Sequence, residues 1–155
     1  MKQSSIGRRF NLTLAILAVI ALASYGMYKN HQKKLWLNEF HLVEATIISL
    51  IDKPPSNCSR QHWNNAVNRV WAGFSNACHN PSTTSAESIR LLGQDIQELI
   101  RGSDVTIELL RRIWTRIGNT SVVAKALIDR HQVDFEDHLR PCERKSSDKE
   151  DKKEM

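Results

Sequence analysis

The stretch NCSRQHWNNAVNRVWAGFSNACHN, residues 57–80, decides how the chain is built, because it sets two cysteines around a Trp-rich segment. Its apolar residues recur at steps of three and four, which is typical of one helix face. A helix over residues 59–77 holds Cys58 and Cys78 about 30 Å apart, whereas a disulfide needs Cα atoms within about 7 Å. These two cysteines therefore cannot pair within one chain, and the same distance excludes a zinc site built from both.

The third cysteine, Cys142, follows the last predicted helix and is the natural partner for one of the others outside the cytoplasm. If five helices alternate in direction, Cys142 ends beside Cys58; if the last two form one kinked rod, it ends beside Cys78. Gly118 indicates a true break, so we expect a Cys58–Cys142 disulfide. The odd cysteine is then buried or pairs between two chains of a homo-oligomer. The alternative is three reduced cysteines in a cytosolic domain.

Helical periodicity extends on both sides of this stretch, from Leu35 to about Arg140, and no segment shows sustained strand alternation. Consecutive prolines in DKPPSN, residues 52–57, end the first helix of this region. The expected starts of the later helices are Thr84 with Glu87 as a capping box, Ser103, and Thr120 or Ser121. The expected core residues are Trp36, Phe40, Val43, Ile47, Leu50, Trp63, Val67, Val70, Trp71, Phe74, Ile89, Leu92, Ile96, Leu99, Ile107, Leu110, Trp114, Ile117, Val123, Leu127 and Phe135. The pattern predicts an all-α fold, an up-and-down bundle of four to five helices behind one N-terminal transmembrane or signal helix.

That N-terminal helix is predicted from FNLTLAILAVIALASYGMY, residues 10–28, which contain no charged residue. As a helix they cover roughly 28 Å, close to the hydrocarbon thickness of a bilayer. Basic residues lie on both sides, and Tyr25 and Tyr28 suit a membrane interface. We expect a retained anchor; the alternative is a secretory signal peptide with an A-x-A cleavage pattern that ends at Ala23.

The expected organisation is a basic flank at residues 1–9, the anchor at 10–28, the helical bundle at 29–140 and a disordered charged tail at 141–155. Residues 1–34 hold six Lys or Arg and no acidic residue, whereas the rest holds sixteen basic and seventeen acidic residues. Phosphate-binding domains carry a basic excess, so we exclude nucleic acid as a partner. We expect the N-terminus inside and the bundle outside the cytoplasm, in the membrane as a single-pass protein.

Candidate chemistry is sparse. The chain has no P-loop, G-x-G-x-x-G, H-E-x-x-H or C-x-x-C motif, and neighbours such as Cys78 and His79 do not face each other on a helix. We therefore predict no enzyme and no cofactor. His131, Asp134 and His138 fall at i, i+3 and i+7 of one predicted helix face, a spacing with which bundles hold metal ions. A solvated polar face is the competing interpretation; His41 and Glu44 of the first helix are the residues that would complete a metal site.

Three arginines, Arg111, Arg112 and Arg116, surround Trp114 in RRIWTR. Arginine favours bidentate contacts with carboxylates and phosphates, and a solvated face is again the alternative. In outline the chain resembles the small membrane-anchored helical domains that bacteria display in the periplasm, although no motif carries that resemblance to one family. We predict a non-enzymatic interaction or sensing module with another envelope or membrane protein as its partner; a metal-binding helical bundle is the alternative.

Overall fold

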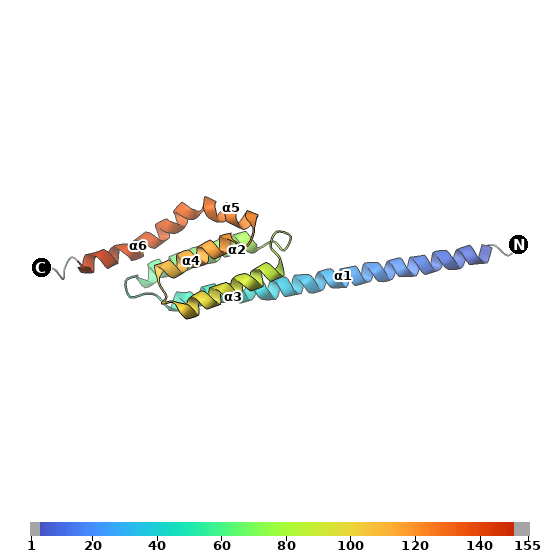
Figure 1. The fold of residues 1–155 in the computed structure, drawn as a ribbon, viewed down its shortest axis with the longest axis horizontal. Coiled ribbons are helices and arrows are strands. Elements are labelled where there is room, and N and C mark those ends of the chain that lie inside the picture. The colour runs from blue at the N-terminus through green and yellow to red at the C-terminus, as the bar shows by residue number, and fades with distance from the viewer. Residues whose placement is uncertain (1–3, 151–155) are drawn as a thin grey trace. The chain divides into compact units, whose positions relative to one another are not determined.

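The structure, a computed structural model, describes the backbone of residues 4–150 and the side chains of residues 13–143. Over this range the chain is all-helical, without a strand, which confirms the all-α part of the predicted fold class (Figure 1). The elements are α1 (Ser4–Ile48), the 3-10 turn η1 (Ser49–Asp52), α2 (Arg60–Cys78), α3 (Ala86–Gly102), α4 (Ile107–Gly118), α5 (Val122–Arg130) and α6 (Gln132–Glu150). The chain forms two units, which divide between Leu35 and Trp36.

The first unit consists of the N-terminal part of α1. Every side chain from residue 13 to residue 35 is exposed, and Leu22 and Met27 are each 72% exposed. A helix that is apolar on all sides has no polar face to turn to water, so it needs either a protein core or a membrane around it. By length and composition, the helix from Thr13 onward could cross a membrane.

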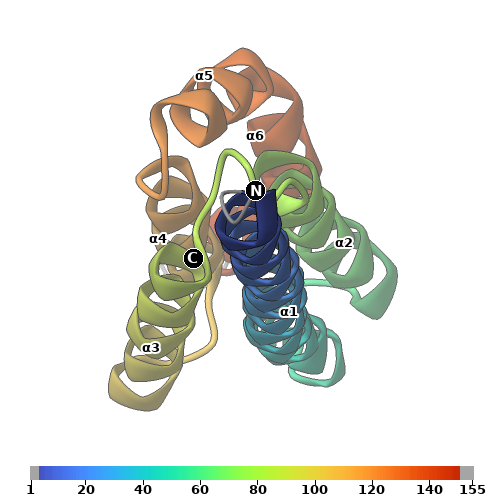
Figure 2. The same cartoon turned by 90° about the vertical axis from the view of Figure 1, so that its right-hand side faces the viewer.

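The second unit is organised around α2, which packs against α4, α5 and α6, while α4 also packs against α3 and α5 (Figure 2). The C-terminal part of α1 belongs to this unit and joins its core. Phe40 of α1 stacks on Phe74 of α2, with ring centroids 4.7 Å apart, and Val43 lies against Gly93 of α3. One continuous core therefore includes the end of α1 and all five later helices.

The predicted core positions from Trp36 to Ile117 are buried, except that Trp71 and Leu99 are only half-buried. A buried indole N–H needs an acceptor, and the buried tryptophans have one. Nε1 of Trp36 donates to the Thr84 carbonyl at 3.0 Å, and Nε1 of Trp63 donates to the carbonyl of Leu50 at 2.6 Å. The tryptophans thus fix the ends of neighbouring helices as well as filling the core.

Two predicted helix starts are wrong by one to three residues. Thr84 does not cap α3; it is 2% exposed, its carbonyl accepts from Trp36, and the hydroxyl of Ser85 accepts the N–H of Ser88 instead. Likewise α4 is capped by Thr106 rather than by Ser103, because residues 103–106 turn the chain between the two helices. The third start was expected at Thr120 or Ser121, and Ser121 caps α5.

The last predicted helix is two helices. α5 ends at Arg130, where the N–H of His131 bonds to the carbonyls of Leu127 and Ile128, a tightened last turn. Its core face also differs from the expected one: Val123 is 54% exposed, and Ala124 and Ile128 are buried in its place. Five complete helices therefore follow the end of α1, instead of the bundle of four to five helices in all that the periodicity predicted.

The charged tail expected from residue 141 begins instead as part of α6. The helix continues through Pro141 to Glu150. Proline removes one helical hydrogen bond, but the next residue, Cys142, is fully buried and joined to Cys58 by a disulfide, with Cα atoms 4.4 Å apart. Of the predicted tail, residues 151–155 lie outside the described range.

Candidate interaction surface

Two of the three predicted metal ligands contact the guanidinium of Arg69, and the third, His138, lies near one of these two. His131 sits between α5 and α6, with Nδ1 3.1 Å from Nη2 of Arg69. Asp134 forms a salt bridge with the same arginine, and Nε2 of His138 is 3.8 Å from Oδ1 of Asp134. Because α5 ends before His131, the three side chains do not share one continuous helix face. In the part of the chain that the structure describes, no three His, Cys, Asp or Glu side chains are grouped so that they could hold a metal ion.

The second predicted pair, His41 and Glu44, lies at the surface, with side chains 66% and 26% exposed. Nδ1 of His41 lies 3.1 Å from Oε2 of Glu44, and Nε1 of Trp71 donates to the other carboxylate oxygen of Glu44 at 2.8 Å. The hydrogen bonds from His41 and Trp71 lower the pKa of Glu44. This carboxylate therefore joins α1 to α2 as an anion.

The unpaired cysteine is a core residue. Cys78 is fully buried, and its Sγ lies 3.6 Å from Oγ1 of Thr120. Burial raises the pKa of the Cys78 thiol, which disfavours the thiolate that a nucleophile requires. His79 is turned away, with Nδ1 2.8 Å from the carbonyl oxygen of Asn76.

One open surface of the second unit follows the boundary between α3 and α4. The four-residue connection, residues 103–106, returns the chain so that these helices lie side by side and run antiparallel (Figures 1 and 2). Three adjoining depressions of about 180, 280 and 370 Å³ lie along this boundary. We call this surface the α3–α4 groove and define it by Leu91, Asp95, Glu98 and Leu99 on α3 and by Arg112 and Arg116 on α4.

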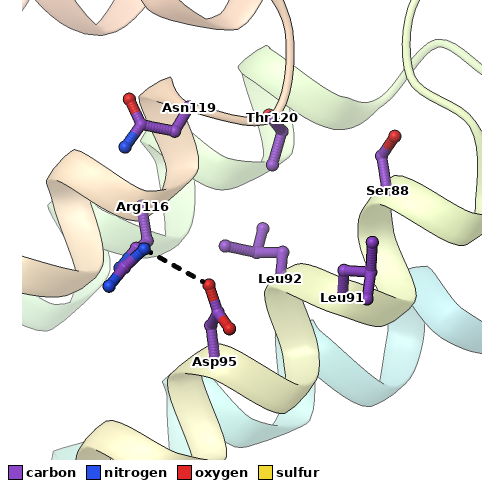
Figure 3. A pocket seen from close by; sticks show the side chains of 7 residues that line it. All are labelled: Ser88, Leu91, Leu92, Asp95, Arg116, Asn119 and Thr120. Carbon is purple, nitrogen blue, oxygen red and sulfur yellow. Dashed lines mark ion pairs between the residues drawn. The ribbon is translucent and has the colours of Figure 1, made fainter.

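One ion pair crosses the groove. Nη1 of Arg116 lies 3.5 Å from Oδ2 of Asp95, and both side chains are about half exposed, at 52% and 48% (Figure 3). Leu91 and Leu92 lie beside this pair, and Leu91 is 48% exposed. An exposed pair of this kind contributes about 0–1 kcal/mol to stability, so its groups stay available to a partner.

The arginines of RRIWTR have different environments. Arg111 forms salt bridges with two acidic residues of α6. Its Nη2 lies 2.7 Å from Oε2 of Glu136 and 2.6 Å from Oε1 of Glu143. The hydrogen bonds that Arg111 donates to these two carboxylates raise the pKa of Arg111 far above its ordinary value. By contrast, Arg112 has one 3.4 Å contact, from Nη1 to the hydroxyl of Ser103. Arg111 therefore holds α6 to α4, whereas Arg112 faces the groove.

The sequence pointed to the arginines but not to the acidic wall that faces them. Asp95 and Glu98 carry no local motif, and only the return of the chain after α3 brings them to the same groove as Arg116. A search for charges at i, i+3 and i+4 within single helices cannot find pairs of this kind.

Comparisons with protein-family models, with curated proteins and with solved structures found no match to this chain.

Proposed function

We propose that the protein is a membrane-anchored helical module that lies outside the cytoplasm and binds another protein through the α3–α4 groove. The observation that carries the proposal is the combination of two features in one chain. An exposed apolar helix precedes a domain whose Cys58 and Cys142 form a disulfide. Disulfides of this kind persist in oxidising compartments and are rare in the cytosol.

The anchor part of the proposal rests on solvation. The side chains of residues 13–28 are exposed on every side of α1. At about 25 cal/mol for each Å² of apolar surface moved out of water, a bilayer around this segment is strongly favourable. The basic residues on both sides of residues 10–28 suit lipid headgroups.

The interaction part rests on the surface of the second unit. The α3–α4 groove combines half-exposed leucines with charged groups that are only weakly engaged. Such a mixture of apolar contact and polar rim is typical of non-obligate protein interfaces. A sensing role is the other form of the same proposal, in which a partner or ligand in the groove changes what the anchor transmits.

A reporter fused after Met155 tests the location. An enzyme that is active only outside the cytoplasm should be active in this fusion, and one that is active only inside should be silent. The reverse pattern would refute the proposed topology. The size of the membrane-bound chain decides between the two N-terminal alternatives, because cleavage near Ala23 would release a shortened protein from the membrane.

A further inference from the structure

We propose that the partner in the α3–α4 groove is a second copy of this chain, docked about a two-fold axis that runs along the groove. The inference rests on the proposed interaction function and names its partner. It comes from the arrangement of charge on the two walls of the groove. In one of two possible two-fold arrangements the walls of the two copies present opposite charges to each other, and in the other they present like charges.

The two walls carry opposite charge. Asp95 and Glu98 lie on the α3 wall, and Arg112 and Arg116 lie on the α4 wall. Among the described side chains, Glu98 and Arg112 have no salt-bridge partner, since the contact of Arg112 is to a hydroxyl. Glu108 also lines the α4 side, but it is paired with Arg111 of its own helix at 3.9 Å.

The opposite charges lie at matching levels along the groove. Arg116 is level with Asp95, because their side chains pair across it at 3.5 Å. One turn further, Arg112 reaches the hydroxyl of Ser103 and lines the same depression as Leu99. In antiparallel helices, one turn toward the C-terminus of α3 corresponds to one turn toward the N-terminus of α4. Arg112 is therefore level with Glu98.

A two-fold rotation about an axis along the groove exchanges the two walls and leaves each level unchanged. It sets Asp95 opposite Arg116 of the partner subunit and Glu98 opposite Arg112 of the partner subunit. A guanidinium has five N–H donors, so Arg116 can keep its contact with its own Asp95 and donate hydrogen bonds to a second carboxylate. A two-fold axis across the groove would instead set acid against acid and arginine against arginine, which is unfavourable.

The leucines supply apolar contact in the same arrangement. Leu99 lines two of the three depressions and lies near the proposed axis, where it meets its own counterpart. Leu91 is 48% exposed and is covered when the second copy docks. The interface is isologous, as in most soluble homodimers. Its exposed ion pairs predict a salt-sensitive equilibrium, and two chains anchored in one membrane reach a higher effective concentration than free chains do.

Two charge variants of the full chain in detergent micelles test the inference. The acidic variant carries Arg112→Glu and Arg116→Glu, and the basic variant carries Asp95→Lys and Glu98→Lys. Each variant alone presents two walls of like charge, so its dimer dissociation constant should rise roughly 30-fold, the usual strength of four exposed ion pairs. The two variants mixed present complementary walls in both directions, so sedimentation velocity should detect a heterodimer.

A cross-link locates the axis. Leu99→Cys should form a disulfide-linked dimer under mild oxidation, whereas Val133→Cys, an exposed position on α6 (71%), should not. The native free cysteine is buried and does not interfere. The charge variants should fold, because Glu98, Arg112 and Arg116 are exposed and Asp95 is half-exposed. Unchanged tryptophan fluorescence and circular dichroism would show this.

Failure of the inference is distinguishable from failure of the proposed function. A wild-type chain that stays monomeric at every concentration, or variants that associate as well as the wild type does and fail to prefer each other, would overturn the second-copy partner. If the wild type is monomeric but the acidic variant loses binding to a defined foreign protein, the second-copy inference is wrong and the interaction function stands. Reporter activity confined to the cytoplasm overturns the proposed function itself.

Discussion

Removing the Cys58–Cys142 disulfide should cost the domain much of its stability. The bond joins residues 84 apart in sequence. In the chain-entropy description, a cross-link that closes a loop of this length removes about 4.5 kcal/mol of conformational freedom, at 25 °C, from the unfolded state. Domains are stable by only about 5–15 kcal/mol in total. For a domain of roughly 110 residues, the loss corresponds to a fall in Tm on the order of 20 °C.

The contacts of α6 predict that the reduced domain still folds. Phe135 stacks on Trp114, with ring centroids 4.3 Å apart, and Leu139 is fully buried. Arg111 holds Glu136 and Glu143 independently of the disulfide. Reduction should therefore lower the midpoint of unfolding without removing the native fold.

Tryptophan fluorescence during urea unfolding is the suitable assay. All four tryptophans lie at residues 36–114 and none lies in the N-terminal unit, so the signal reports the domain even when the full chain is in micelles. The wild type is compared with and without reductant, and Cys58→Ala with Cys142→Ala should match the reduced protein. Cys78→Ala is the control, because its loss of stability should be the same in both redox states. If reduction changes the free energy of unfolding by less than about 1 kcal/mol, the reasoning from loop entropy is refuted.

Three further outcomes follow from particular contacts. Gly73→Ala should lower the free energy of unfolding in urea by about 1–3 kcal/mol, because a Cβ would overlap the indole ring of Trp114 in α4. Gly102→Ala is the control, and because the space around Gly102 is open, it should be neutral or stabilising. Equal effects of the two substitutions would contradict the packing. Ser121→Ala should cost about 1 kcal/mol by loss of the α5 cap, and Ser121→Asp should retain most of it. Zinc, nickel or copper should leave the melting curve unchanged, and His131→Ala with His138→Ala should cost about 0.5 kcal/mol or less; a metal-dependent rise in Tm that this double variant abolishes would favour the metal-binding alternative.

The sequence predicted the helices and most of the core because both depend on local periodicity. Trp63, Val67, Val70 and Phe74 recur on one face of α2, and all four are fully buried. The exposed apolar part of α1 was equally visible, since it depends on composition alone. The expected alternation in direction of successive helices led to the pairing of Cys58 with Cys142, the pair that the structure joins.

Features that depend on tertiary contacts were not predictable. No Gly or Pro marks the break at His131, so the periodicity continued through it and gave three candidate ligands a common face that they lack. A charged tail was expected from Pro141 onward. Instead α6 continues through Pro141, and the next residue, Cys142, is buried in the core. The acidic wall of the α3–α4 groove likewise exists only because the chain returns after α3.

The most direct test of the account is the accessibility of one introduced thiol. Val133→Cys lies on an exposed position of α6, and the only free native cysteine of the chain is buried. In intact cells, or in cells stripped of any outer barrier, a membrane-impermeant maleimide should label this full-length, membrane-bound variant without detergent, and the unsubstituted chain should remain unlabelled. Labelling that appears only after the membrane is dissolved would place the domain inside the cytoplasm and contradict the account.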